Sequence, residues 1–317
     1  MKYSLMTHMI DREIKLKKPT FIHLLIMKDM GYQGQAPTLE EAFAFLRAHG
    51  MPVENGAMTF RDVVKFAKDN GFDGIDVMAH HFSESGEDAK AVLREFGITL
   101  SAINIIESFS ESADEAEFNA HLEAVKDVID RGAAAGCKNF LVMPVGYTPA
   151  PGKTLEETYQ LMVRGLRACV AYGQEQGVTI NTETLESSAV PLCSIGNLRR
   201  IFTDVPGLKY SHDTGNALVA LEDPLAVYET FKDRLAAVHF KDLGYQDEKA
   251  DSRDLLGRYL DKVRYGDGLV DFPGHLRALK RDDYQGFITV EGWRSTESQL
   301  EGAVSALRYF REMEQSL

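Results

Sequence analysis

Cysteine is scarce in this chain of 317 residues, and its three cysteines, Cys137, Cys169 and Cys193, lie far apart in the sequence. No CxxC pair occurs, so the sequence predicts neither a zinc knuckle nor a disulfide framework, and it suits a reducing compartment. A long apolar run is missing as well. The most apolar early segment, residues 20–27, is too short to cross a bilayer, and the first residues lack the apolar core of a signal peptide. We therefore expect a cytoplasmic protein without a membrane partner.

Positive charge is also in short supply. The chain has 48 Asp and Glu against 35 Lys and Arg, which gives a formal net charge of −13. Because phosphate binding needs a dense basic surface, this balance disfavours a nucleic-acid partner. Hydrophobic residues make up 44% of the chain, enough for a substantial core, and no internal repeat or low-complexity segment is visible.

What the sequence does contain is a regular alternation of strand and helix patterns. The predicted strands are short apolar runs at residues 2–7, 74–77, 99–105, 139–144, 178–182, 209–211, 236–240 and 287–290. Eight strands alternating with helices over about 300 residues favour a (β/α)8 TIM barrel, an α/β fold. The competing fold, an open doubly wound sheet, normally carries a Gly-rich phosphate loop after its first strand, and no GxGxxG occurs here.

The helix predictions rest on apolar positions near the 3.6-residue period and on capping residues. They cover residues 59–70, 114–135, 155–176, 195–202, 224–231, 272–280 and 298–314. Thr59 and Thr154 are predicted N-caps, and Glu157 has capping-box spacing from Thr154. We interpret residues 1–317 as one barrel domain.

Two segments exceed the needs of a minimal barrel. Residues 10–58 follow the first predicted strand, so the barrel carries an N-terminal insertion, and residues 245–264 follow the seventh. Both are expected on the face where barrel loops build active sites. Loops of this length in a compact fold are usually functional, so each is interpreted as an active-site lid or as a subunit contact.

Four apolar runs in the second half end in an acidic residue or an imidazole. These end residues are Glu183 in VTINTE, Asp213 in LKYSHD, His239 in RLAAVH and Glu291 in GFITVE. Parallel strands direct their carboxyl ends to one face, so the four side chains should converge there. Three carboxylates with one nitrogen ligand suit Mn²⁺, Mg²⁺ or Co²⁺ better than a metal that seeks thiolates. We expect one divalent metal, with Mn²⁺ as the first candidate.

From residue 177 to residue 291 the chain resembles the xylose isomerase-like TIM-barrel superfamily of sugar isomerases, epimerases and related dehydratases. The segments that carry the resemblance are GVTINTE, LKYSHDTGN, RLAAVHFKD, YGDGLVDF and YQGFITVE. The resemblance implies that Glu183, Asp213, His239 and Glu291 bind one divalent metal. It also implies that Glu183 and Glu291 act as catalytic acid and base. Removal of a proton next to a carbonyl suits such a pair beside a Lewis-acidic metal.

The chain departs from two branches of this superfamily. Branches that hold two or three metals, including the apurinic endonucleases, carry His at the position of Asn216, and they add a later Asp-x-His that is missing here. One metal is therefore the better interpretation. Ketose 3-epimerases of the tagatose type also carry His at that position and an Arg at the position of Tyr245, so their substrate contacts do not transfer.

Other polar residues stand at or just beyond predicted strand ends, where side chains tend to line the pocket. The predicted substrate-binding residues are His8, His80, Glu107, Asn216, Lys241 and Arg294. His80 and His81 are adjacent, so at most one of them should face inward. His212 precedes Asp213 and should point to the opposite side of its strand, either to pack there or to support the metal ligands from behind. Trp293 either gives a sugar ring an apolar face or lies in the core or at the rim.

Three functions are compatible with the sequence. The leading one is a metal-dependent isomerase or epimerase that moves a proton next to the carbonyl of a small-molecule sugar or polyol. The second is a lyase on the same scaffold, acting as a keto-inositol or dehydroshikimate-type dehydratase or cleaving an oxidised C-glycoside. The third is a non-catalytic sugar-binding or assembly barrel, which the intact acid and base glutamates argue against. A homo-oligomer or a partner subunit on residues 10–58 stays open.

Overall fold

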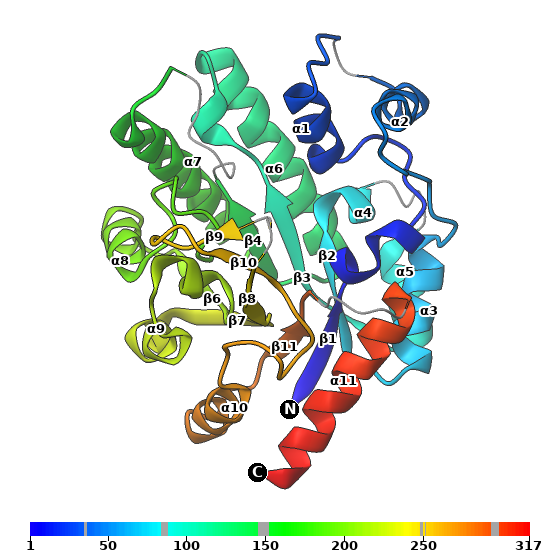
Figure 1. The fold of residues 1–317 in the computed structure, drawn as a ribbon, viewed down its shortest axis with the longest axis vertical. Coiled ribbons are helices and arrows are strands. Elements are labelled where there is room, and N and C mark those ends of the chain that lie inside the picture. The colour runs from blue at the N-terminus through cyan, green and yellow to red at the C-terminus, as the bar shows by residue number, and fades with distance from the viewer. Residues whose placement is uncertain (35–36, 84–87, 145–151, 248–249, 251, 293–297) are drawn as a thin grey trace.

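Eight parallel strands close into a barrel in the computed structural model (Figure 1). The structure describes residues 1–34, 37–83, 88–144, 152–247, 250, 252–292 and 298–317. The barrel strands are β1 (Lys2–Met6), β2 (Gly74–Met78), β3 (Thr99–Ile106), β4 (Asn139–Met143), β5 (Thr179–Thr182), β6 (Lys209–Asp213), β7 (Leu235–Phe240) and β11 (Phe287–Val290). Their order around the barrel is β1-β11-β7-β6-β5-β4-β3-β2. The predicted barrel is confirmed, and no strand end differs from its predicted position by more than two residues.

Helices follow the strands and form an outer ring around the barrel (Figure 1). The ring comprises α3 (Phe60–Asp69), α5 (Ala89–Phe96), α6 (Glu115–Ala135), α7 (Leu155–Glu175), α8 (Ile195–Asp204), α9 (Pro224–Phe231), α10 (Phe272–Arg281) and α11 (Gln299–Ser316). The predicted capping box at α7 is present: Glu157 N donates to Thr154 Oγ1 at 3.2 Å, and Thr154 N donates to Glu157 Oε2 at 2.7 Å. Helix α5 was not among the predicted helices.

Close packing of α6 against β3 and β4 shows how tightly the helix ring fits the barrel. A Cβ atom added at Gly132 of α6 would lie 2.6 Å from Ile103 Cδ1 and 2.6 Å from Phe140 Cε1. Both neighbours are fully buried strand residues. The strands read as continuous apolar runs because one of their faces fills the barrel interior and the other packs against helices.

The first insertion lies beyond the carboxyl ends of the strands (Figure 1). A parallel bridge between Ile14 and Met58 joins its two ends. Between them, α1 (Phe21–Asp29) and α2 (Leu39–Ala48) build a small apolar cluster around Met27 and Leu46 that is separate from the main core. The insertion thus folds as a helical pair on the face that carries the strand ends.

The second insertion forms a small antiparallel sheet that the sequence did not predict. Its strands are β8 (Leu243–Gln246), β9 (Ser252–Arg253) and β10 (Tyr259–Lys262), in the order β8-β10-β9. The sheet packs on the barrel through a small cluster of Val219, Leu243 and Leu260, all fully buried. The second insertion is therefore a folded sheet that begins three residues after β7 and packs on the barrel.

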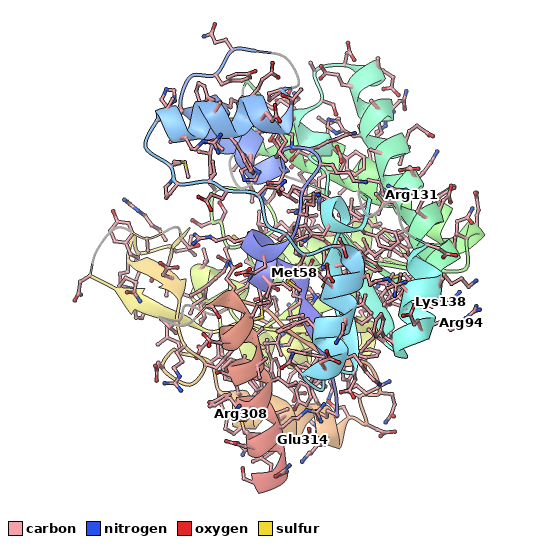
Figure 2. All side chains as sticks on the ribbon, turned by 90° about the vertical axis from the view of Figure 1, so that its right-hand side faces the viewer. Met58, Arg94, Arg131, Lys138, Arg308 and Glu314 are labelled. Carbon is pink, nitrogen blue, oxygen red and sulfur yellow. The ribbon has the colours of Figure 1, made fainter. Side chains whose placement is uncertain are left out.

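The two ends of the chain meet at the opposite end of the barrel (Figure 1). The amino group of Met1 donates to Glu314 Oε1, and Tyr3 Oη donates to Glu314 Oε2 at 3.1 Å. Glu314 and Arg308 belong to α11, which covers β1 on the outside of the barrel (Figure 2). Within the described ranges, no helix combines the length and the apolar character that crossing a membrane demands.

Candidate metal centre and cavity

The four predicted ligand residues come together at the carboxyl ends of four neighbouring strands. Glu183 directly follows β5, and Asp213 is the last residue of β6. His239 lies one residue before the end of β7, and Glu291 directly follows β11. Because β5, β6, β7 and β11 are consecutive in the barrel, residues far apart in the sequence reach one small volume.

The donor atoms of these four residues fit a single cation. One donor atom from each lies within 4.8 Å of the other three. His239 Nδ1 is 3.1 Å from Glu183 Oε2 and 3.0 Å from Glu291 Oε2. These three atoms and Asp213 Oδ2 are buried, and none makes a hydrogen bond of good geometry within the described residues. A metal ion with bonds of about 2.0–2.5 Å requires several unpaired ligand atoms this close together. We call Glu183, Asp213, His239 and Glu291 the cluster.

The carboxylate of Asp76 lies behind the imidazole of His239, a neighbour that the sequence did not predict. Asp76 is a fully buried residue of β2, and its Oδ2 lies 3.2 Å from His239 Nε2. Thr289 Oγ1 donates to the same oxygen at 2.8 Å, and Asn104 Nδ2 donates to Oδ1. With a cation bound among the four residues, a proton on Nε2 facing this carboxylate would leave the lone pair of Nδ1 for the cation. A charged residue in the middle of the apolar run GIDVM was the available signal.

A tight turn after β6 fixes the carboxylate of Asp213. Its Oδ1 accepts hydrogen bonds from the backbone N–H groups of Gly215 and Asn216, both at 2.8 Å. Its other oxygen, Oδ2, is therefore left facing the cluster. Gly215 also makes room for a neighbour, since a Cβ there would lie 3.0 Å from Lys241 Cγ.

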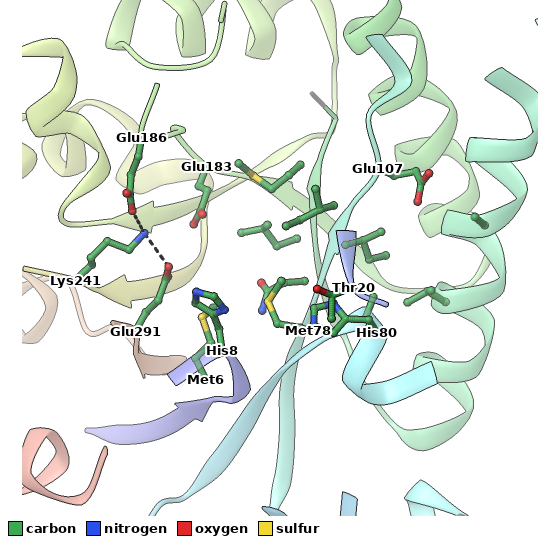
Figure 3. A pocket seen from close by; sticks show the side chains of 18 of the residues that line it. Met6, His8, Thr20, Met78, His80, Glu107, Glu183, Glu186, Lys241 and Glu291 are labelled. Carbon is green, nitrogen blue, oxygen red and sulfur yellow. Dashed lines mark hydrogen bonds and ion pairs between the residues drawn. The ribbon is translucent and has the colours of Figure 1, made fainter. Parts of the chain in front are cut away.

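Lys241 connects the cluster to a further carboxylate, that of Glu186. Its Nζ donates to Glu186 Oε1 at 2.6 Å and lies 2.7 Å from Glu291 Oε1 (Figure 3). It also lies 3.2 Å from Asp213 Oδ2. Glu186 was missed although it stands three residues after Glu183, because it lies in a loop without a recognisable pattern. Three carboxylates (Glu186, Asp213 and Glu291) thus contact one ammonium group.

Burial controls the protonation of these carboxylates, since it removes the water that stabilises their charge. Burial raises the pKa of Glu183, and it raises the pKa of Asp213 to about 8 despite the nearby Lys241 ammonium. Burial acts in the same direction on Glu291, but Lys241 and His239 outweigh it and hold the pKa of that carboxyl well below its usual range. The buried carboxylates therefore carry more negative charge than Lys241 and His239 can balance, and a divalent cation in the cluster would supply the missing positive charge.

A cavity of about 320 Å³ opens beside the cluster (Figure 3). Glu183 and Glu291 line it, whereas Asp213 and His239 are not among its described lining residues. Both insertions contribute to the wall: Thr20 belongs to the first, and Lys262 of β10 belongs to the second. Residues of both insertions thus reach the cavity, and Lys262 was not among the predicted site residues.

Histidines form part of the cavity wall near the cluster. His8 and His80 line the cavity, whereas His81 turns away and bonds Thr7 Oγ1 through Nδ1 at 2.9 Å. One of the two adjacent histidines faces inward, as predicted. Burial lowers the pKa of His8, and it lowers the pKa of His80 to about 4. Both rings are therefore neutral near pH 7 and can hydrogen-bond hydroxyl groups.

His212 lies on the opposite side of its strand from the cluster, as predicted. Its ring stacks on His275 with 5.2 Å between ring centroids and packs edge-on against Tyr228 at 5.4 Å. All three rings are buried between the barrel and its helices. The histidine thus belongs to the packing of α9 and α10 against β6.

Of the other predicted substrate-binding residues, some line the cavity and others do not. Lys241 and Glu107 line the cavity, and Glu107 Oε1 is bonded to His121 Nδ1. Asn216 is not among the described lining residues; its Oδ1 accepts from Lys241 Nζ at 3.1 Å, so it holds that side chain from behind. Arg294 and Trp293 lie outside the described residues.

Asp242 explains why the HFKD and GDG segments occur together in this chain. Its Oδ2 accepts hydrogen bonds from Gly266 N at 2.9 Å and Gly268 N at 3.1 Å. A Cβ at position 268 would lie 2.1 Å from Asp242 Oδ1, so only glycine allows this contact. The two segments form one structural unit behind the strand that carries His239.

Comparison with known proteins adds to this geometry. The family described as Xylose isomerase-like TIM barrel matches residues 64–313. The chain belongs to this family. Among solved structures, 3-keto-D-glucoside 4-epimerase from E. coli has a TM-score of 0.65 and 17% identity, covering 81% of this chain and 95% of that one. The IolI protein, crystallised with a bound zinc atom, has a TM-score of 0.64 and 16% identity, covering 82% of this chain and 94% of that one. At these identities the likeness shows the fold.

Curated relatives of this family member include inosose dehydratases. The enzyme of Geobacillus kaustophilus is 27% identical over 231 residues, which cover 68% of this chain and 74% of that protein. The enzyme of Lacticaseibacillus casei is 30% identical over 115 residues, 34% of this chain. That match spans only 38% of the relative's own length.

Proposed function

We propose that this protein is a divalent-metal-dependent enzyme that removes a proton next to the carbonyl group of a keto-polyol or keto-sugar. The observation that carries the proposal is the convergence of three buried carboxylates and His239, with Glu183 and Glu291 in contact with Nδ1 and Asp76 next to the other ring nitrogen. The proposed ligands are Glu183, Asp213, His239 and Glu291, with Mn²⁺ as first candidate and Mg²⁺ or Co²⁺ as alternatives. When bound, the cation would act as a Lewis acid that polarises the substrate carbonyl.

Glu183 and Glu291 are the proposed proton-transfer residues. They line the cavity, in contrast to Asp213 and His239, so their carboxylates can meet the substrate directly. They also come from β5 and β11, which β6 and β7 separate in the barrel. A substrate between them would present one face to each glutamate. One carboxylate can then accept the proton, and the other can return one.

Lys241 is proposed to stabilise the negative charge that develops on a substrate oxygen during proton removal. Its ammonium is buried at the cavity wall and is held in place by Glu186 and Asn216. A preorganised cation in a site with little water stabilises an oxyanion far more than an exposed lysine could. Neutral His8 and His80 are proposed to hold substrate hydroxyl groups.

Loss of water is the outcome that we propose after proton removal. The inosose dehydratase relatives favour it, since their names describe dehydration of a keto-polyol. Epimerisation is the second candidate, because the two glutamates approach from different strands and could exchange protons on both faces of one carbon. Both outcomes begin with the same abstraction, so the residues assigned above serve either.

The test is a panel of inososes and keto-sugars incubated with Mn²⁺-loaded protein in D₂O and followed by NMR. The proposal expects an unsaturated product with loss of a hydroxyl group. Deuterium at one carbon without loss of water would support the epimerase alternative instead. If no compound in the panel exchanges a proton, while the protein is folded and metal-loaded, the enzymatic proposal fails and the non-catalytic barrel gains support.

A further inference from the structure

The cavity has two chemically different sides. Its polar side comes from β5, β7 and β11 and the loops after them, with Glu183, Glu186, Lys241 and Glu291. The opposite side comes from β3, β4 and α6, on the far side of the barrel order from β7, and His8, Thr20 and His80 belong to a third part of the lining. Figure 3 shows the carboxylates and Lys241 on one side of the cavity and Glu107 on the other.

The side formed by β3, β4 and α6 is mostly hydrocarbon, and its polar members are Asn104 of β3 and Glu107. We call its hydrocarbon part the apolar wall; it consists of Ile105, Ile106, Ala124, Val128, Leu141 and Met143. The charged group beside it, the Glu107 carboxylate, is already bonded to His121. Asn104 Nδ2 already donates to Asp76, which leaves its Oδ1 as one acceptor on this side. A bare polyol that reached the six apolar side chains would still leave most of its hydroxyl groups there without partners, which is costly.

Space is available along the apolar wall as well as beside the cluster. Ala124 lines the cavity and is nevertheless exposed, so the wall opens to solvent at this point of α6. Ala124 and Val128 are one helical turn apart and present their small side chains to the same side. The continuous cavity of about 320 Å³ therefore offers room for a group beyond the ring that the cluster would bind.

We infer that the substrate carries a ring-sized apolar substituent that packs on the apolar wall while its keto-polyol part meets the cluster. This inference rests on the proposed function and narrows its substrate class from small polyols to keto-sugars linked to an apolar group. Met143 at the end of β4 suits such a ligand, because a flexible thioether side chain adapts to the face of a ring.

The test compares two ligands that differ only in the substituent, the methyl and the phenyl glycoside of one keto-hexose. Binding to the Mn²⁺-loaded protein is measured by calorimetry at a temperature and time at which turnover is negligible. Removal of one ring face from water predicts a Kd roughly 10- to 100-fold lower for the phenyl glycoside. Equal affinities would overturn the inference and leave the proposed function standing. If neither glycoside binds, the inference is overturned as well, and the proposed function is then decided separately by the panel of inososes and keto-sugars in D₂O.

Ala124→Trp tests where the substituent packs. The tryptophan should fill the apolar wall and abolish the advantage of the phenyl glycoside, while the Kd of the methyl glycoside changes less than about threefold. Ala134→Trp is the matched control, since Ala134 is exposed near the carboxyl end of the same helix, about 15 Å away along its axis. An unchanged phenyl advantage in Ala124→Trp would contradict the inference. If Ala124→Trp does not fold, Ile106→Asp replaces it in the test. A charge on the apolar wall should likewise abolish the affinity advantage of the phenyl glycoside.

Discussion

Replacing Asp76 by Asn tests whether the buried carboxylate behind His239 prepares the metal centre. Asp76 Oδ2 lies 3.2 Å from His239 Nε2 and is held in place by Thr289 Oγ1 at 2.8 Å. Asn keeps the size of the side chain but removes the charge that keeps the imidazole proton on Nε2. Loss of such a supporting carboxylate typically weakens metal binding 10- to 100-fold, or about 1.4 to 2.7 kcal/mol. We expect this loss in a Mn²⁺ titration of chelator-treated protein followed by electron paramagnetic resonance.

The control for Asp76→Asn is Asp73→Asn. Asp73 precedes the same strand, accepts from Tyr3 N at 2.8 Å and lies outside the described cavity lining. Its substitution should leave the Mn²⁺ Kd unchanged even if it lowers stability. If Asp76→Asn binds Mn²⁺ within threefold of wild type, the carboxylate does not orient the imidazole, and the reasoning from the His239 contacts is wrong.

Three further predictions concern the centre and the packing around it. Glu291→Gln should keep part of the metal affinity yet lose turnover by roughly 10²–10⁴-fold. His239→Ala should instead regain activity as the Mn²⁺ concentration is raised. Full recovery of Glu291→Gln activity at saturating Mn²⁺ would show that Glu291 is a metal ligand and not an acid or base. Gly132→Ala should lower the free energy of unfolding by about 1–3 kcal/mol through overpacking of α6 on the barrel, and an unchanged urea midpoint would argue against that packing. Burial lowers the pKa of His275, so the unfolded state takes up a proton first as the pH falls below about 6.5, and stability should drop by up to about 1.4 kcal/mol per pH unit. His275→Gln should flatten this slope between pH 7 and pH 5 in urea unfolding, and a slope equal to wild type would refute it.

The barrel and the position of its four central side chains could be predicted from the sequence for one reason. Each of the four runs ends in a polar residue that a buried strand carries to its carboxyl end, as at Asp213 of β6 and Glu291 after β11. Strand alternation likewise predicted that His212 faces the helices while Asp213 faces the cluster. These predictions depend only on the alternation of side chains along a strand and on the parallel arrangement of the barrel strands.

Residues that act from outside this pattern could not be predicted in the same way. Asp76 reaches His239 from a strand on the other side of β1 and β11, so its role depends on barrel closure. Lys262 enters the cavity only because residues 243–262 fold into a sheet, whose antiparallel pairing gave no clear signal in a charged segment. Glu186 becomes part of the site through its contact with Lys241, which no spacing rule anticipates.

The account depends most on the claim that Glu183, Asp213, His239 and Glu291 together hold one divalent ion. Crystals grown with Mn²⁺ and measured at the manganese absorption edge test this claim directly. The account predicts one anomalous peak at the strand ends of β5, β6, β7 and β11, bonded to all four residues at about 2.0–2.5 Å. Crystals at saturating Mn²⁺ with no peak among these side chains, or with the ion bound elsewhere, would contradict it.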